Sequence, residues 1–525
     1  MRWRLRAEVR GKKVVVSSSH PLATLSGIRV FEKGGNFMDA ALAVSSTLCV
    51  VQNNLCGLGG DMFALVGNLG GRIRSLNASG RAGKLCTPEF FRNKGMNEIP
   101  KRGPLSAVTV PGLVDGWNQL LKNYCSFELA DLLSYAVEAA ETGFPVTINY
   151  SASVSASQRT LGEYENWRKI FTPDGGAPAA GSLFRQKDLA SSLRSIAEEG
   201  AESFYRGSLC ARMVKGIDKL GGVLTEEDFA HHTSNWEEPL KTDYRGLTVY
   251  ETPPNSQAAT VLLWLNMLEN ADVGSMGFGT PECLKMFYKT CAAAYSERAK
   301  WIGDPRSVHL PRDFLSKEYA RGLLDESEPA PITSKKEPGS DTTYFAVADC
   351  EGNFASVIQS NYMGFGSGVV PEGTGIVLHN RGCYFTLDAS SHNQIAPGKR
   401  TFHTLCASAA SRDGEPALVI GSMGGDIQPQ IHVQLMTNVV DFNMDLQSAI
   451  DAPRWAAQAT IYDKELHYMV EEELAEAARR AVSPKVEVLS RLSSTTGHAQ
   501  GVLFERNGTL VGAADGRGDG LALGY

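Results

Sequence analysis

Hydrophobic and polar positions recur at helical spacing in several long stretches of the chain. From Glu128 to Thr142 the apolar residues return every three or four positions, and Gly143 follows as a stop. Asp188 to Glu199 repeats this pattern, so both stretches predict amphipathic helices. Phe37 to Val51 is apolar nearly all round, which predicts a buried helix. Pro429 to Val440 predicts another, with its proline in the first turn.

Shorter apolar runs between turn residues predict strands. Val14 to Ser17 is the first of these, Met62 to Val66 follows a glycine-rich turn, and Ala417 to Gly421 has the composition of a buried strand. Strands mixed with long helices in this irregular order favour an α+β protein over a repeat protein.

A hairpin is predicted where Thr342 to Asp349 and Phe354 to Ser360 flank four residues of turn chemistry. The preceding run, residues 327–340, is polar, holds three prolines and has no periodicity. A loop of this kind entering a buried strand indicates a site of chain cleavage, between Asp341 and Thr342.

Cleavage there would change the chemistry of Thr342. Its amide nitrogen would become an α-amine with a pKa of about 8, close enough to activate its own hydroxyl for acyl transfer. The alternative is that Thr342 and Thr343 simply begin a strand, as threonines often do. The hairpin by itself leaves both interpretations open.

Composition and charge narrow the class of protein. The 525 residues are 43% hydrophobic and 21% charged, as in a soluble globular protein of two to four domains. The net charge of −7 is spread without blocks, so neither a nucleic acid nor a membrane surface is expected as a partner. The ten cysteines form no CxxC pair, which favours reduced core thiols. The apolar run after the basic start, Val14 to Val16, is too short for a signal peptide, which predicts a cytoplasmic location.

Two glycine-rich turns are candidates for ligand contacts. The turn from Asn53 to Asp61 is followed by a strand and lacks a GKS/T sequence, so close backbone packing explains it better than phosphate binding. Gly424 and Gly425 follow a predicted strand, where two backbone N–H groups can hold an oxyanion. An ordinary strand-to-helix turn is the alternative for this second pair.

Polar side chains elsewhere add weaker candidates. Arg81 follows a turn and is a candidate clamp for a carboxylate, although a surface arginine is the commoner outcome. His403 beside Thr404 is a candidate substrate contact, with a structural histidine as the alternative. No HExxH or GxSxG sequence occurs, so we expect no metal, no cofactor and no serine-hydrolase elbow.

Taken together and in order, the motifs resemble those of the gamma-glutamyltranspeptidase family of N-terminal nucleophile hydrolases. The resemblance spans nearly the whole chain and rests on Gly57 to Phe63, Val110-Pro111-Gly112, Thr342-Thr343, Phe365 to Gly368, Gly373 to Ile376, Pro397 to Arg400, Gly421 to Gly425, Asp451 to Arg454 and Gly512 to Tyr525.

The resemblance implies a four-layer αββα sandwich made by a precursor that cuts itself before Thr342. A large segment, 1–341, and a small segment, 342–525, would then form one intertwined fold. It also implies that Ser360 hydrogen-bonds the nucleophile, that Gly424 and Gly425 hold the oxyanion, and that Thr404 helps to hold the glutamyl carboxylate. The expected partner is a small gamma-glutamyl or other acyl amide, and a homo-oligomer of processed heterodimers is also expected.

This chain departs from the family pattern at the amino-acid end of the donor site. Tyr384 stands where family members hold the α-ammonium with an acidic residue, Arg381 replaces a glutamine, and Tyr362 replaces an asparagine. Arg81 stands only approximately where the family has its carboxylate-clamping arginine. Replacing an anion and adding a cation should disfavour an ammonium, by roughly 1 to 4 kcal/mol at about 4 Å. The short segment Thr386 to Gly398 also predicts that a lid loop is absent.

The sequence therefore predicts a self-processing gamma-glutamyl transferase or hydrolase with Thr342 as its nucleophile. The first alternative is an acylase of the same fold for glutaryl-type amides without a free amine, in which Arg81 and Arg381 would bind the distal carboxylate. The second is an uncut relative that only binds a ligand.

Overall fold

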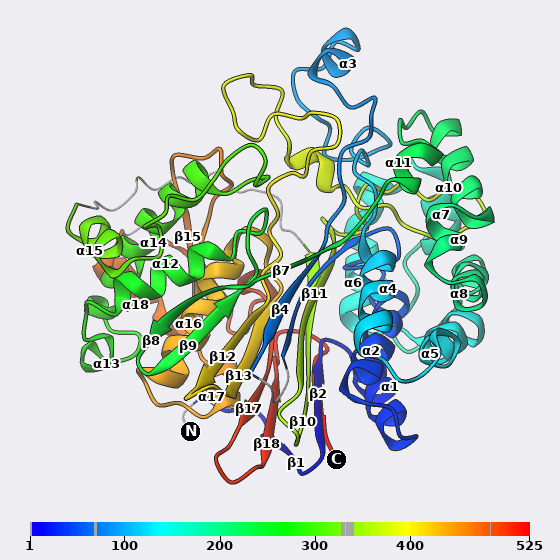
Figure 1. Cartoon of the computed structure of the whole chain (residues 1–525). Coiled ribbons are helices and arrows are strands. Elements are labelled where there is room, and N and C mark those ends of the chain that lie inside the picture. The colour runs from blue at the N-terminus through cyan, green and yellow to red at the C-terminus, as the bar shows by residue number, and fades with distance from the viewer. Residues whose placement is uncertain (1–2, 68–70, 327–330, 332–340, 484) are drawn as a thin grey trace.

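The computed structural model describes residues 3–67, 71–326, 331, 341–483 and 485–525. Two seven-stranded antiparallel sheets pack face to face at its centre, with helices outside each of them (Figure 1). This arrangement is the predicted αββα sandwich. The predicted loop at 327–340 lies outside the described residues apart from position 331.

One sheet carries Thr342 and is called the threonine sheet below. Its strands, in spatial order, are β19 (Leu521–Gly524), β2 (Val14–Ser18), β10 (Asp341–Asp349), β11 (Phe354–Tyr362), β3 (Asp61–Gly67), β4 (Ile73–Ala78) and β7 (Asn235–Glu237). Strands from both sides of the Asp341–Thr342 bond therefore pair with one another in this sheet.

The other sheet leads to Gly424 and Gly425 and is called the glycine sheet. Its order is β1 (Val9–Gly11), β18 (Leu510–Ala514), β17 (Ala499–Phe504), β13 (Glu415–Ser422), β12 (Ser408–Arg412), β9 (Leu247–Glu251) and β8 (Leu240–Tyr244). Small and β-branched side chains such as Ala346, Ala409 and Val419 fill the space between the two sheets. Larger side chains such as Phe63 and Tyr344 belong to the same buried cluster and complete the packing between the two sheets.

Helices cover the outer face of each sheet (Figure 1). The threonine sheet is covered by α1 (Pro21–Glu32), α2 (Phe37–Val51), α4 (Leu113–Tyr124), α5 (Leu129–Thr142) and, further out, α8 (Lys187–Glu199), α9 (Ala201–Tyr205), α10 (Ser208–Lys219) and α11 (Glu226–Ala230). The glycine sheet is covered by α12 (Ala259–Leu268), α14 (Pro281–Trp301), α16 (Gln428–Val440) and α17 (Leu446–Asp451), with α13 (Val273–Met276), α15 (Lys317–Glu326) and α18 (Ala475–Ala481) outside them.

Smaller elements complete the chain near the ends of the sheets. They are α3 (Pro88–Asn93), α6 (Ile148–Leu161), α7 (Glu165–Phe171), the two-stranded pair β5 (Phe144–Pro145) and β6 (Leu183–Phe184), and a small sheet of β14 (Trp455–Gln458), β15 (His467–Glu471) and β16 (Glu487–Leu489).

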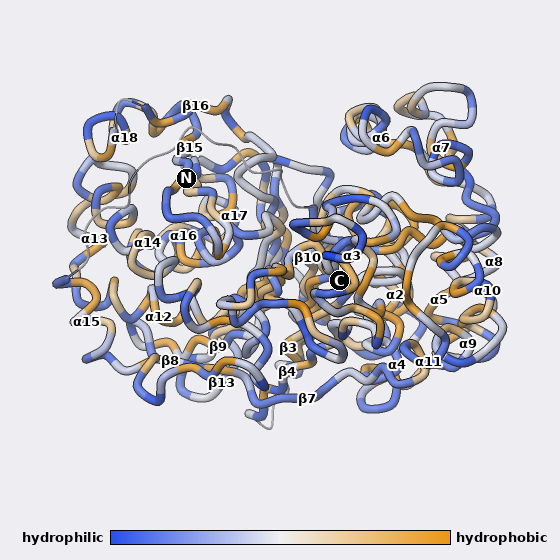
Figure 2. The backbone as a smooth tube through the Cα atoms, turned by 90° about the horizontal axis from the view of Figure 1, so that it is seen from above, coloured by the Kyte–Doolittle hydropathy of each residue, from blue (hydrophilic) through white to orange (hydrophobic). Residues whose placement is uncertain are grey.

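The predicted helices agree closely with the observed ones. Every residue of α2 is buried, as expected for a helix that is apolar on all sides. Figure 2 shows hydrophobic segments around α2 and β3 and hydrophilic ones at outer elements such as α18. In α16, Pro429 lies in the first turn as predicted.

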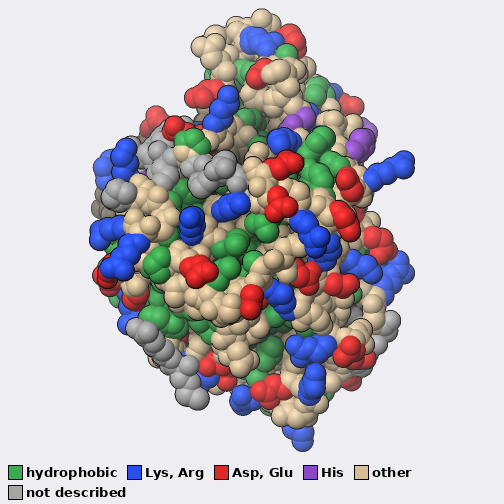
Figure 3. All heavy atoms as spheres, turned by 90° about the vertical axis from the view of Figure 1, so that its left-hand side faces the viewer, with side chains coloured by type: hydrophobic (Ala, Val, Ile, Leu, Met, Phe, Trp, Pro, Cys, Tyr) green, Lys and Arg blue, Asp and Glu red, His purple; other side chains and the backbone are tan. Residues whose placement is uncertain are grey.

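The surface and the cysteines also follow the composition. On the face in Figure 3, positive and negative side chains are intermixed around small hydrophobic spots. All ten cysteines fall within the described residues and are free thiols, and seven of them are buried. Among the described helices, none combines the length and apolar character that crossing a bilayer requires.

Candidate active site

The hairpin of β10 and β11 contains an irregularity at Thr342. Asp341 pairs with Tyr362, but Thr343 pairs with Gln359, so two residues of β11 lie opposite Thr342 alone. A β-bulge of this kind re-aims a side chain and disturbs the regular ladder, and bulges often occur next to active sites. Tyr362 ends β11 with a φ of 76°, in the left-handed region that non-glycine residues rarely adopt.

The bulge places Thr342 and Ser360 in a short chain of hydrogen bonds. The Thr342 hydroxyl donates to Ser360 Oγ at 3.0 Å, and the Ser360 hydroxyl donates to the carbonyl oxygen of Asp341 at 2.8 Å. The backbone N–H of Tyr362 donates to Ser360 Oγ at 2.7 Å and fixes this side chain. The predicted contact between Ser360 and Thr342 is therefore present, and the same serine also polarises the carbonyl of the predicted scissile bond.

The glycine-rich turn before β3 supports this geometry through close packing. A Cβ atom on Gly60 would lie 2.5 Å from the carbonyl oxygen of Ser360, and one on Gly59 would lie 2.2 Å from the carbonyl oxygen of Val377. Both distances are shorter than any real contact, so only glycine fits here. Close packing, as the sequence predicted, explains these glycines.

Gly424 and Gly425 form the turn that follows β13. Their φ values are 143° and 58°, which side chains rarely allow. Within the described part of the chain, neither backbone N–H of the pair donates a hydrogen bond. Two free N–H groups at a tight turn suit an oxyanion site.

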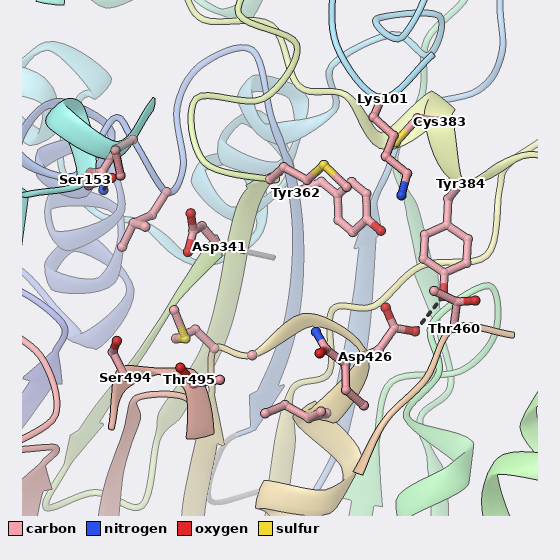
Figure 4. A pocket seen from close by; sticks show the side chains of 18 of the residues that line it. Lys101, Ser153, Asp341, Tyr362, Cys383, Tyr384, Asp426, Thr460, Ser494 and Thr495 are labelled. Atoms are coloured by element: carbon pink, nitrogen blue, oxygen red, sulfur yellow. Dashed lines mark hydrogen bonds between the residues drawn. The ribbon is translucent and has the colours of Figure 1, made fainter. Parts of the chain in front are cut away.

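A cavity of about 960 Å³ opens at this end of the sheets. Its walls come from segments far apart in sequence, among them α6, β15 and β16, the turn at Gly424, and the loops that carry Lys101 and Tyr462 (Figure 4). Of the predicted site residues, Asp341, Tyr362, Tyr384 and Gly424 line it. Thr342 and Ser360 are buried beside it, 1% and 2% exposed.

Asp426 lies on the wall of this cavity, and sequence reasoning did not identify it as a site residue. Its Oδ1 accepts a hydrogen bond from the Tyr384 hydroxyl at 2.5 Å (Figure 4). The same oxygen lies 3.1 Å from Nη1 of Arg298. Burial raises the pKa of Asp426, while the Arg298 guanidinium acts to lower it. A carboxylate thus stands next to Tyr384, where the family comparison had suggested that the anion was lost.

Arg81, a predicted substrate contact, is not brought into the cavity. It is absent from the lining residues, and its Nη1 donates to the carbonyl oxygen of Gly398 at 3.5 Å. Burial and the nearby Arg306 lower its pKa, while Asp304 and Glu237 offset this effect. Its neighbours therefore belong to a polar cluster outside the site, so the clamp role is not supported by its position.

Arg381 is also placed differently from the expectation. It is 2% exposed, its guanidinium carbon lies 3.9 Å from the centre of the Tyr362 ring, and Nη2 donates to the Thr404 hydroxyl at 2.9 Å. It does not line the cavity. Burial lowers the pKa of this guanidinium. Arg381 therefore packs against the ring of Tyr362 and is not one of the residues that line the cavity.

His403 and Thr404 are buried away from the lining as well. His403 Nε2 lies 3.1 Å from Oδ2 of Asp61, and burial lowers the pKa of this histidine to about 3, which keeps the imidazole neutral. Thr404 accepts the hydrogen bond from Arg381. The surroundings of His403 support its structural alternative, and Thr404 contacts Arg381 and does not line the cavity.

The residue before the predicted cut also has an unusual environment. Burial raises the pKa of Asp341 to about 6, against the opposing effects of Arg102 and the Gly364 N–H. A Cβ atom on Gly364 would lie 2.5 Å from Asp341 Oδ2, so this glycine leaves room for the carboxyl group.

Within the described ranges, no group of three or more histidine, cysteine, aspartate or glutamate side chains is arranged so that it could hold a metal ion. The Thr342 hydroxyl lies in a hydrogen-bonded chain with Ser360, and within the described part of the chain the N–H groups of Gly424 and Gly425 donate no hydrogen bond.

Comparisons with known proteins find similar chains over nearly the whole length. Residues 23–525 match the family model described as gamma-glutamyltranspeptidase. The chain is 39% identical to the glutathione hydrolase-like YwrD proenzyme of Bacillus subtilis (strain 168), over 98% of this chain and 99% of that protein. It is 35% identical to the oxamate amidohydrolase proenzyme of Klebsiella pneumoniae, over 96% and 97%. The crystal structure of cephalosporin acylase from Bacillus halodurans superposes with a TM-score of 0.92 at 37% identity, covering 99% of this chain and 97% of that one.

Proposed function

The chain belongs to the gamma-glutamyltranspeptidase family, and we propose that it is a self-processing enzyme with Thr342 as its nucleophile and gamma-glutamyl-type amides as its acyl donors. The observation that carries this proposal is the hydrogen-bonded chain from Thr342 through Ser360 to the carbonyl oxygen of Asp341. A threonine that merely begins a strand needs no such arrangement.

Processing would use this chain directly. The Thr342 hydroxyl attacks the carbonyl carbon of Asp341, whose oxygen is already held by Ser360, and the C–N bond to Thr342 breaks as the nitrogen takes the proton. The product is an ester between Asp341 and the Thr342 side chain. Water then hydrolyses this ester, which leaves a carboxylate on Asp341 and a free α-amine on Thr342.

In turnover, the Thr342 hydroxyl would attack the carbonyl of an external amide in the same way. The new α-amine, with a pKa of about 8, is partly neutral at pH 7 and accepts the hydroxyl proton as the hydroxyl attacks the donor carbonyl. The N–H groups of Gly424 and Gly425 stabilise the oxyanion, and the leaving amine takes the proton. Water or an acceptor amine then resolves the acyl-enzyme. A preorganised N–H group that hydrogen-bonds the oxyanion contributes about 10²- to 10³-fold in rate.

A kinetic comparison tests the substrate class. We expect release of p-nitroaniline from gamma-glutamyl-p-nitroanilide, with glutaryl-p-nitroanilide as the matched donor that lacks the ammonium. The two donors are otherwise alike, so the ratio of their kcat/KM values reports the preference for the ammonium. Inertness toward both would contradict this function and the glutaryl alternative together.

A glutaryl-type acylase is the second candidate, because a structure of similar fold at 37% identity is that of a cephalosporin acylase. The residues proposed to hold its distal carboxylate give it less support. Neither Arg81 nor Arg381 lines the cavity, and Lys101 is the one lysine or arginine among its described lining residues. Faster turnover of the glutaryl donor would favour this candidate.

An uncut ligand-binding relative is the remaining alternative from the sequence. A denaturing gel separates it from the enzyme, because a processed enzyme gives two fragments and an uncut relative gives one band of full length. The relatives named as proenzymes support two fragments. The cytoplasmic location and the homo-oligomer stay predictions.

A further inference from the structure

The carboxylate of Asp426 has one oxygen that the protein does not use. Its Oδ1 accepts hydrogen bonds from both the Tyr384 hydroxyl and the Arg298 guanidinium, whereas no described residue donates a hydrogen bond to Oδ2. The side chain is 12% exposed and lines the main cavity. A buried carboxylate fixed by one oxygen, with the other turned to a cavity, is suited to receive a donor from a ligand.

The charges around the cavity favour a cation as that ligand. Its described lining includes six carboxylates and one lysine, with no arginine; the carboxylates are Glu98, Asp341, Asp426, Asp463, Glu487 and Asp519. Low-dielectric walls of one sign concentrate the field inside a cleft. Arg298 is fully buried and also donates to Gln257 Oε1 and the carbonyl oxygen of Ala459, so its charge is shared among several acceptors.

The position of Asp426 relates this carboxylate to the acyl-transfer chemistry. It is the next residue after Gly425 and lies in the same short turn, η2 (Gly425–Ile427). The turn is anchored because the carbonyl oxygen of Asp426 accepts the Tyr295 hydroxyl and that of Gly425 accepts Nε2 of Gln257. The oxyanion N–H groups and the carboxylate are therefore held at a fixed separation by one rigid turn.

We propose that Asp426 is the specificity-determining residue that binds a primary ammonium group of the acyl donor through Oδ2. This inference rests on the proposed acyl transfer at Thr342 and defines the donor class as acyl groups that carry an ammonium beyond the reacting carbonyl. Lys101 projects into the same cavity (Figure 4), so a carboxylate beside that ammonium also meets an opposite charge.

Asp426→Asn tests this assignment, because the amide keeps the shape of the side chain and an acceptor for Tyr384 while it removes the charge. We expect kcat/KM for gamma-glutamyl-p-nitroanilide to fall about 10- to 100-fold, mainly through KM, as for the loss of one charged partner. The value for glutaryl-p-nitroanilide should stay the same or rise. An equal fall for both donors, or no change in their ratio, would overturn the assignment and indicate a structural role.

Two further variants keep the test decisive. Asp519→Asn removes another carboxylate from the same cavity, but both of its oxygens are occupied, by Thr147 and Asn149, so the donor ratio should not move. A matching shift there would mean that the general field selects the donor, which would contradict a contact at Asp426. Tyr384→Phe keeps the charge of Asp426 and should change the ratio less than Asp426→Asn does; an equal change would contradict the assignment.

Processing distinguishes failure of this inference from failure of the proposed function. Asp426→Asn should still yield two fragments on a denaturing gel, because the processing contacts run through Ser360. A cut variant with an unchanged donor ratio would refute the Asp426 assignment alone. Wild-type protein that is uncut, or inert toward both anilides, would refute the proposed function and the assignment with it.

Discussion

The residues around Thr342 and the residues expected to bind the donor differ in how well the sequence predicted their positions. Beside the predicted cut, the hydrogen bond between Thr342 and Ser360 that the family resemblance implied is present, and Gly424 lines the cavity. Among the residues expected at the donor, Arg81 lies outside the cavity and Arg381 contacts the ring of Tyr362, whereas Asp426 supplies a carboxylate to the lining. The chemistry depends on the register of neighbouring strands, whereas recognition depends on side chains from separate loops, which can exchange roles.

Removing the nucleophile should have the largest effect. Thr342→Ala should leave the protein folded, uncut and inactive, with a loss of several decades in rate. Activity on gamma-glutamyl-p-nitroanilide and a denaturing gel measure both results. Thr343→Ala is the matched control: its hydroxyl bonds Ser19 and Gln52, so its loss should lower the melting temperature, at a cost of about 1–3 kcal/mol, but still permit the cut. Full turnover by Thr342→Ala would refute the mechanism.

Removing the Ser360 hydroxyl should have the next largest effect. Ser360→Ala takes away the donor to the Asp341 carbonyl and the acceptor for Thr342, so processing should slow by about 10²- to 10³-fold. A time course of fragment formation after rapid purification measures this rate. Ser356→Ala removes another buried hydroxyl of β11, which bonds Tyr344 and the carbonyl oxygen of Ser408, and should process at the wild-type rate. Equal slowing in both variants would indicate a loss of strand packing instead.

Substituting Arg81 should have little effect on the donor. Because this side chain lies outside the cavity, Arg81→Gln should leave kcat and KM unchanged for both anilides, even if the melting temperature falls. A tenfold rise in KM would correspond to about 1.4 kcal/mol of lost binding. A rise of that size would show that Arg81 contacts the donor, and the sequence would then have predicted the donor-binding residues as well as those around Thr342.

Burial of Asp341 predicts a pH-dependent change in the stability of the uncut chain. Burial raises the pKa of Asp341 to about 6 from an ordinary value of 3.8, so the folded state binds this proton more tightly than the unfolded state. The resulting stability is fully present below about pH 4 and is lost as the pH rises through about 6.

Asp341→Asn in a Thr342→Ala background tests this sign. Compared with Thr342→Ala alone, it should be more stable by about 1–2 kcal/mol at pH 7.5 and equal at pH 4, as judged by urea denaturation. Equal stability at both pH values would show that the Asp341 carboxyl is not destabilised by burial.

The elements with strong local patterns were predictable from sequence. The fully apolar run of α2 and the hairpin of β10 and β11 were found with nearly correct ends. The bulge at Thr342 was not predicted, because it depends on how β10 aligns with β11 and the turn before β3, and periodicity carries no signal for one unpaired residue.

The positions of the residues expected to bind the substrate could not be predicted for a different reason. Arg381 follows a motif that aligns with the family, but its direction is set by the ring of Tyr362 and the hydroxyl of Thr404. Asp426 directly follows the glycine pair in the sequence. A charged residue beside a predicted oxyanion turn was the sequence signal that could have identified it as a site residue. Its partner Arg298 comes from α14, which no short motif connects to the site.

The amino terminus of the small chain tests the account most directly. Intact-mass and amino-terminal analysis of the purified wild-type protein should give two chains, one ending at Asp341 and the other beginning with a free amine on Thr342. A single uncut chain with full acyl-transfer activity would contradict the account, because Thr342 would then have no α-amine to accept its proton.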